Sequence, residues 1–85
     1  ERLNPYIRGT IDDMLIEAIH AHNNQRLDTA IEIYTRIIES KPTPNNIVLS
    51  VIHKHRGMAY FSKNDFENAL NDFDSSFELD KRIKK

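Results

Sequence analysis

Four histidines occur as two close pairs, His20 with His22 and His53 with His55. Imidazole is a common zinc ligand. On one helix, however, ligands to one metal ion need a spacing of three or four residues, because a spacing of two turns the second side chain about 200° away from the first. The chain has no cysteine and no His-Glu-x-x-His motif. The sequence therefore predicts no metal site on a single helix, and a site shared between two helices is the alternative.

Several carboxylates are candidates for general acid–base catalysis, namely Asp12, Asp13, Asp65, Glu67, Asp72 and Asp74. We place them at helix starts and on exposed faces, where capping and the helix dipole account for acidic residues. The sequence has no Gly-x-Ser-x-Gly motif for a serine nucleophile and no glycine-rich phosphate-binding loop. We therefore expect no catalytic residue, no metal, no cofactor and no enzymatic activity.

The elements that position these side chains are expected to be helices, because apolar residues recur every three or four positions in four segments. The first helix is predicted from residue 11, with Thr10 as its N-cap. It should end near Asn23 and Asn24, which tolerate left-handed backbone conformations. The second helix is predicted over 27–38 and should stop before Pro42.

Thr43 is a candidate N-cap for the third helix, since Pro44 suits the first helical position. This helix is predicted to reach Ser62 and carries apolar residues nearly all round, so we expect it to be covered on more than one side. Asp65 is expected to cap the fourth helix, which starts at Phe66. Because the turns are short, the predicted fold is all-α, with four helices in two antiparallel hairpins.

The second and fourth helical segments match each other when the sequence is shifted by 39 residues, and this shift indicates an internal repeat. Apolar, small and acidic residues each fall on residues of their own kind. The matched pairs are Leu27 with Phe66, Asp28 with Glu67, Ala30 with Ala69, Ile31 with Leu70, Tyr34 with Phe73, Ile38 with Phe77 and Glu39 with Glu78.

These units resemble the tetratricopeptide repeat family, whose helical hairpins stack as an α-solenoid. The residues that carry the resemblance are Ala18, Ala30 and Tyr34 in the first unit, and Gly57, Tyr60, Ala69 and Phe73 in the second. The resemblance implies that Gly57, inside a helix, lets that helix approach the next one closely near Ala69. Packing at this contact would then offset the roughly 1 kcal/mol that a glycine costs inside a helix.

The resemblance also suggests how the chain is divided. The first repeat would cover 11–42, and the second would cover 43–81 with a first helix extended at its N-terminus. Residues 1–10 would be an N-terminal segment, which resembles the tail of a preceding repeat. Residues 82–85 would be a basic tail or the start of a further helix.

The family binds peptides or helices of other proteins in a concave groove formed by the first helix of each pair. Carried onto this sequence, the groove would contain Leu15, Ile19, His22, Lys54, Met58 and Phe61, with Asp12, Val51 and Ser62 nearby. The apolar members would take side chains of the ligand, and Lys54 would pair with an acidic group. The alternative is that these residues pack against one another or against a further repeat.

One branch of the family, the co-chaperones, holds acidic C-terminal tails with a clamp of lysine and asparagine side chains. Here Leu15, Ile19 and His55 stand at the corresponding positions, so we do not expect a clamp of that kind in these two repeats.

The overall charge narrows the choice of partner. With 12 basic and 13 acidic residues the net charge is −1, and no basic stripe suggests nucleic-acid binding. No apolar run approaches the length of about 18 residues that a membrane span needs. The lack of cysteine fits the cytoplasm or another reducing compartment. Besides a protein-binding module, we consider a homodimer that buries Leu15, Ile19, Met58 and Phe61, and an accessory domain of an enzyme.

Overall fold

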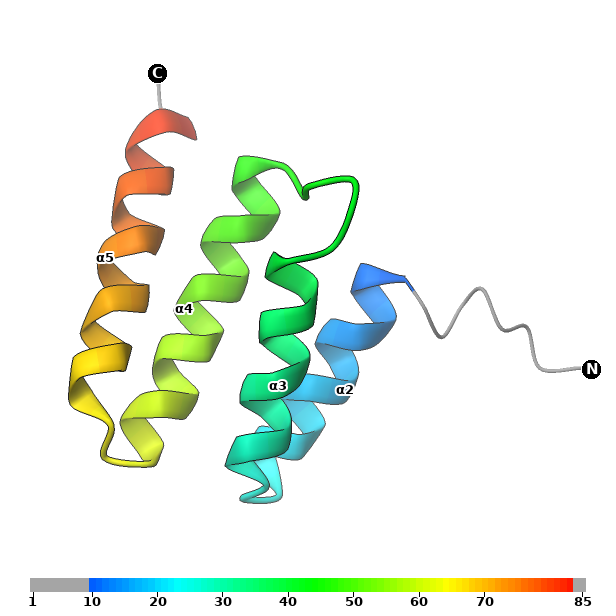
Figure 1. Ribbon diagram of the computed structural model, residues 1–85, viewed down its shortest axis with the longest axis vertical. Coiled ribbons are helices and arrows are strands. Elements are labelled where there is room, and N and C mark those ends of the chain that lie inside the picture. Colours follow the sequence, from blue (N-terminus) through cyan, green and yellow to red (C-terminus); the bar gives the residue numbers. More distant parts are fainter. Residues whose placement is uncertain (1–9, 84–85) are drawn as a thin grey trace, which may run out of the picture.

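The computed structural model describes residues 10–83, which form four helices and no strand (Figure 1). The helices are α2 (Ile11–Asn23), α3 (Leu27–Ile38), α4 (Asn46–Ser62) and α5 (Phe66–Ile83). Consecutive helices run in opposite directions, so that α2 pairs with α3 and α4 pairs with α5 (Figure 1). The predicted all-α class and its helical hairpins are confirmed. Of the predicted terminal segments, residues 1–9 and 84–85 lie outside the described residues.

The helices form a thin slab of 42 × 33 × 16 Å in which α5 lies at one edge and α2 lies behind α3 (Figure 1). The first helices of the two pairs differ in length, with 17 residues in α4 and 13 in α2. Helix α5 continues through Arg82 to Ile83, so these two residues of the predicted tail are helical. Within residues 10–83, none of the helices is long and apolar enough to cross a membrane.

The helix starts show which capping predictions hold. Thr10 caps α2, because its hydroxyl accepts a hydrogen bond from the amide of Asp13 at 3.1 Å. The prediction for the third helix was wrong by two residues. Asn45, rather than Thr43, caps α4 by accepting from the amide of Val48 at 2.9 Å. Asparagine is at least as strong an N-cap as threonine, so the helix starts after Asn45 and leaves Pro44 outside it.

The turns within the two hairpins have the same backbone form. Gln25 and Asn64, which are 39 positions apart, have left-handed φ angles of 65° and 68°. In each turn the next amide donates to the carbonyl five residues earlier, from Arg26 to Ala21 at 2.8 Å and from Asp65 to Tyr60 at 2.9 Å. Asparagine adopts this conformation readily and glutamine less so. In the turn between α2 and α3 the left-handed residue is nevertheless Gln25, and not Asn23 or Asn24, which the sequence suggested.

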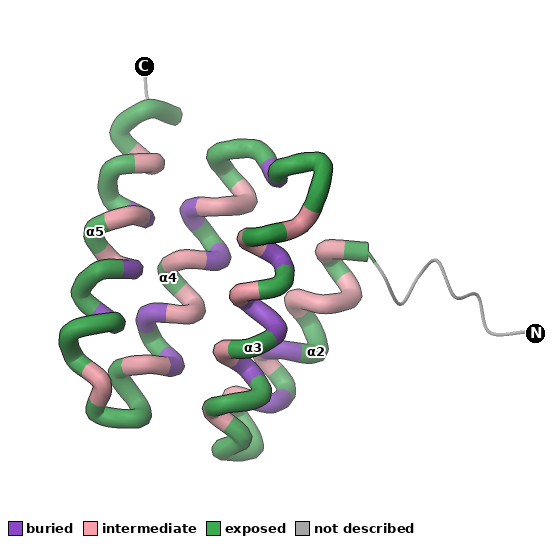
Figure 2. The backbone as a smooth tube through the Cα atoms, in the orientation of Figure 1, coloured by how far each residue is buried: buried purple, intermediate pink, exposed green. Residues whose placement is uncertain are grey.

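The apolar core lies between α2, α3 and α4 (Figure 2). Its largest fully buried side chains are Tyr34, Ile37 and Ile52. Burial of such a side chain stabilises a fold by roughly 1.5–3 kcal/mol. Helix α4 is thus covered by α3 on one side and by α5 on the other, as its apolar composition predicted.

A set of buried and half-buried polar groups joins helix α5 to α4, and we call it the polar seam. Its members are Ser50, His53 and Arg56 of α4 and Asp72, Ser76 and Asp80 of α5. Arg56 donates to both oxygens of Asp72 at 2.8 Å, and the imidazole Nδ1 of His53 lies 2.8 Å from Oδ1 of the same carboxylate. Asp72 is only 3% exposed. The prediction that Asp72 lies on an exposed face was therefore wrong, because two side chains of α4 compensate its buried charge.

Candidate protein-binding groove

The residues predicted to line a groove come from α2 and α4, and the structure brings most of them together in two hollows. Ile19 and Lys54 line neither of these hollows. The first, of about 290 Å³, is lined by His22, Met58, Phe61, Ser62 and Phe73. The second, of about 150 Å³, is lined by Ile11, Asp12, Leu15, Ile47, Val48, Val51 and Ile52. A side-chain hydrogen bond joins the helices at one end, where Nε2 of His22 lies 3.3 Å from Oγ of Ser62. We call this surface of α2 and α4 the groove.

Helix α4 presents several apolar side chains at the groove. Met58 is 46% exposed and Phe61 is 58% exposed, and Ile47 and Val51 are also exposed. They share one face because their spacings of three, four and seven residues follow the helical repeat. Single exposed apolar residues are ordinary, whereas a contiguous row of them marks a site of interaction. Ile47 was not predicted to line the groove, although it falls on the same helical spacing as Val51.

The predicted groove residues of α2 are less accessible than those of α4. Leu15 and Ile19 are half-buried, and Leu15 packs against the apolar core. His22 is also half-buried. The accessible apolar surface of the groove therefore comes mainly from α4, while α2 forms its opposite wall.

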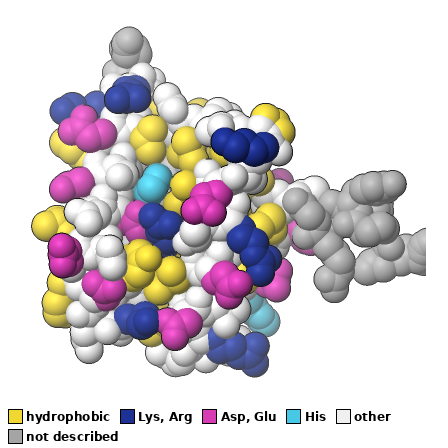
Figure 3. Space-filling model, viewed as in Figure 1, with side chains coloured by type: hydrophobic (Ala, Val, Ile, Leu, Met, Phe, Trp, Pro, Cys, Tyr) yellow, Lys and Arg dark blue, Asp and Glu magenta, His cyan; other side chains and the backbone are white. Residues whose placement is uncertain are grey.

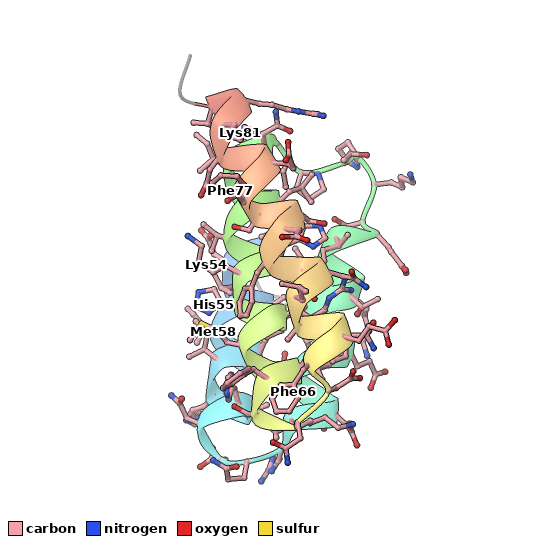
Figure 4. All side chains as sticks on the ribbon, turned by 90° about the vertical axis from the view of Figure 1, so that its left-hand side faces the viewer. Lys54, His55, Met58, Phe66, Phe77 and Lys81 are labelled. Carbon is pink, nitrogen blue, oxygen red and sulfur yellow. The ribbon has the colours of Figure 1, made fainter. Side chains whose placement is uncertain are left out.

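Positive groups stand beside this apolar surface, and Figure 4 shows Lys54, His55 and Met58 on the same side of the slab. The ammonium of Lys54 lies 4.0 Å from a carboxylate oxygen of Asp80. Both side chains are about half exposed, and an ion pair of this kind contributes at most about 1 kcal/mol. Lys54 is therefore available to an acidic group of a ligand.

His55 connects the groove with the core, because its ring stacks on Tyr34 with centroids 6.0 Å apart. Burial lowers the pKa of His55, and the nearby positive groups His22 and Lys54 lower it further. Because its pKa lies below the ordinary value of 6.5, His55 is a neutral aromatic contact near pH 7 rather than a cation.

The residues that carry the family resemblance lie on buried or half-buried faces of the four helices. Ala18, Ala30, Tyr34, Gly57 and Ala69 are buried, and Tyr60 and Phe73 are half-buried. Tyr34 is fully buried, and its hydroxyl has no hydrogen-bond partner among the described residues. Burial raises the pKa of this hydroxyl to about 12.

The paired histidines are not brought together around a common centre. His22 contacts Ser62, His53 contacts Asp72 and His55 stacks on Tyr34. Across residues 10–83, no group of three or more His, Asp or Glu side chains is arranged to hold a metal ion. Comparison of the chain with protein-family models, with curated proteins and with solved structures finds no match.

Proposed function

We propose that this chain is a non-catalytic protein–protein interaction module that binds a peptide or helix of a partner protein in the groove. The observation that carries this proposal is the row of exposed apolar side chains on α4 beside the hollow that holds Met58 and Phe61. A hollow of about 290 Å³ can receive one or two apolar side chains of a ligand. Such anchors, placed in pockets, supply most of the binding energy of protein interfaces.

The charges suggest the kind of ligand. Lys54 stands on the same helix face as Met58, one turn away, and both are exposed. We propose that the ligand carries an acidic group for Lys54 within about one helical turn of its apolar anchor. Such a charged contact mainly contributes specificity and the rate of association.

We further propose that the chain is a two-repeat segment of a tetratricopeptide-like α-solenoid. Two observations support this assignment besides the 39-residue shift. The hairpin turns have the same hydrogen bonds and the same left-handed position, and Gly57 stands at a close approach of two helices. A repeat of this family in the cytoplasm or another reducing compartment would act as an adaptor or scaffold.

The proposal is tested by affinity capture from a lysate with the wild-type chain, Met58→Glu and Leu70→Glu, each checked for helicity by circular dichroism. Met58 lies in the groove, whereas Leu70 is an exposed apolar residue of α5 outside it. A groove partner is lost with Met58→Glu and kept with Leu70→Glu. If no captured protein shows this dependence, the groove is not the binding site.

The alternative of a homodimer through the groove predicts a different result. Light scattering would then give twice the monomer mass for the wild-type chain, and Phe61→Glu would return it to a monomer.

A further inference from the structure

Helix α5 has an unpartnered apolar face. Its exposed residues Phe66, Leu70 and Phe77 are 55%, 60% and 60% exposed, and with Phe73 they follow a spacing of four, three and four residues along one helix face. Among the described helices, α5 contacts only α4. A hollow of about 350 Å³ at this face is lined by Phe61, Phe66, Ala69, Leu70 and Phe73. Figure 4, in which α5 faces the viewer, shows Phe66 and Phe77 on this open side.

The molecule contains a covered counterpart of this face. The residues 39 positions earlier, Leu27, Ile31, Tyr34 and Ile38, lie on α3. There Tyr34 is fully buried and the other three are half-buried. Helix α4 packs against α3 there, since His55 stacks on Tyr34 and Ile52 belongs to the same buried cluster as Tyr34. Ile31 and Ile38 pack against this cluster. The chain thus shows that a helix with apolar residues packs against a face of this composition.

Two polar contacts fix α4 on α3. Lys63, directly after α4, donates to the carboxylate of Asp28, and Arg56 donates to the hydroxyl of Thr35 at 3.0 Å. The two cations are seven residues apart on α4, and their acceptors are seven residues apart on α3. The order of the acceptors is reversed, because α3 and α4 are antiparallel. The residues 39 positions after these acceptors are Glu67 and Asp74.

Glu67 and Asp74 are both exposed, and within residues 10–83 neither side chain has a hydrogen-bond or ion-pair partner. The two aligned positions are both acidic on α5, whereas on α3 they are an aspartate and a threonine. Figure 3 shows acidic and apolar side chains side by side along the edge of the molecule where α5 lies. This edge is thus suited to a helix that carries positive charge.

We propose that the open face of α5 docks a basic amphipathic helix of a partner protein, antiparallel to α5. This helix carries apolar residues for the row from Phe66 to Phe77 and two cations seven residues apart. The first cation of the partner helix contacts Asp74 of α5, and the second contacts Glu67. In the same order, Arg56 of α4 contacts Thr35 of α3, and Lys63 contacts Asp28. The hollow on this face adjoins the groove hollow and shares Phe61 and Phe73 with it, but it includes neither Lys54 nor Met58. The inference therefore goes beyond the proposed function. A second copy of α5 fits less well, because it would place Glu67, Asp74 and Glu78 against the same acidic residues.

The probe is a synthetic fluorescent peptide with the sequence of residues 45–63, which contains the two cations and the apolar residues of α4. Gly57→Ala is included in the peptide to favour the helix. Fluorescence anisotropy measures its binding to the whole chain. We expect saturable binding that weakens about tenfold with Leu70→Glu and about tenfold with the charge reversal Glu67→Lys/Asp74→Lys.

The decisive comparison is a charge swap, in which a second peptide carries Arg56→Glu and Lys63→Glu. The proposal predicts that this second peptide binds the charge-reversed chain more tightly than the wild-type chain. The substitution Met58→Glu in the chain should leave the affinity for each of the two peptides unchanged. All of the chain variants alter exposed residues, and circular dichroism checks that they fold. Absence of saturable binding, or a swap that does not restore it, overturns the proposal. Wild-type dimers that dissociate with Leu70→Glu would also overturn it, in favour of a second copy on this face.

Discussion

A Cβ atom on residue 57 would lie only 2.8 Å from Cε1 of Phe73, and 3.2 Å from the backbone carbonyl oxygen of Ala69. Helices α4 and α5 therefore approach each other closely at a position where α4 has no side chain. The cost of a glycine inside a helix, about 1 kcal/mol, is offset by the contacts that this approach permits.

Replacement of this glycine by a large side chain should be more destabilising than helix propensity suggests. Gly57→Leu improves the helix propensity, but it overpacks the contact with Phe73. We expect the free energy of unfolding to fall by about 3 kcal/mol, as measured by urea denaturation. The neighbouring change Met58→Leu, at an exposed position, should alter it by less than about 0.5 kcal/mol. An unchanged or increased stability of Gly57→Leu contradicts the close approach.

Removal of the carboxylate of Asp72 should damage the polar seam. Asp72→Ala leaves Arg56 and His53 without their shared acceptor in a mostly buried site, so we expect a loss of about 3–5 kcal/mol. The control is Asp74→Ala, two residues further along α5, where the side chain is exposed and the expected change is below about 0.5 kcal/mol. Equal effects of the two substitutions would show that the seam does not attach α5 to α4.

The same carboxylate should make stability depend on acidic pH. Burial acts to raise the pKa of Asp72, but hydrogen bonds from His53 and Arg56 outweigh it, so that the pKa lies below the ordinary value of 3.8. Because the unfolded chain then binds the proton more tightly, this stabilisation is present above pH 3.8 and is lost as the pH falls through the lower, folded-state pKa.

Thermal unfolding of the wild-type chain and Asp72→Asn between pH 2 and pH 6 measures this dependence. The difference in stability between the two chains should shrink as the pH decreases below about 4. A difference that stays constant over this range is inconsistent with the lowered pKa.

Removal of the buried hydroxyl of Tyr34 should not weaken the fold. This hydroxyl has no partner among the described residues, so Tyr34→Phe removes an uncompensated polar group and leaves the ring in place. We expect the free energy of unfolding to increase by about 1 kcal/mol, with a higher thermal midpoint. Tyr60→Phe, at a half-buried position, is the matched control and should change it little. A clear loss of stability in Tyr34→Phe would mean that the hydroxyl is bonded in the folded protein.

Local sequence patterns predict the helices well. The three-to-four spacing of apolar residues locates α2, α3 and the start of α5, because amphipathic helices need one apolar face. The start of α4 was predicted two residues too early. Thr43 and Asn45 are both suitable caps, and the sequence alone does not show which of the two side chains accepts a hydrogen bond from a free backbone amide. The left-handed Gln25 was missed for a similar reason, because the turn requires this conformation whichever residue occupies the position.

The polar seam could not be predicted from local spacing, since it joins Arg56 and Asp72, which are 16 residues apart and lie on different helices. The 39-residue shift gave one indication that Asp72 is buried, because it aligns Asp72 with Ile33, an apolar residue that is buried in α3. That Lys54, Met58 and Phe61 share one face of α4 was easier to predict, because it follows from their spacing along a single helix. Their role in binding a partner stays a prediction.

The central claim is that a partner protein binds against the groove face of α4, and site-specific photocrosslinking tests it most directly. The photoreactive residue p-benzoylphenylalanine is placed at Met58 in one chain and at Glu32, an exposed position of α3, in another. Both chains are irradiated in a lysate. A partner bound in the groove gives a defined crosslinked product from position 58 that is absent from position 32. Crosslinks of the same partner from position 32 but not from position 58 would contradict the central claim.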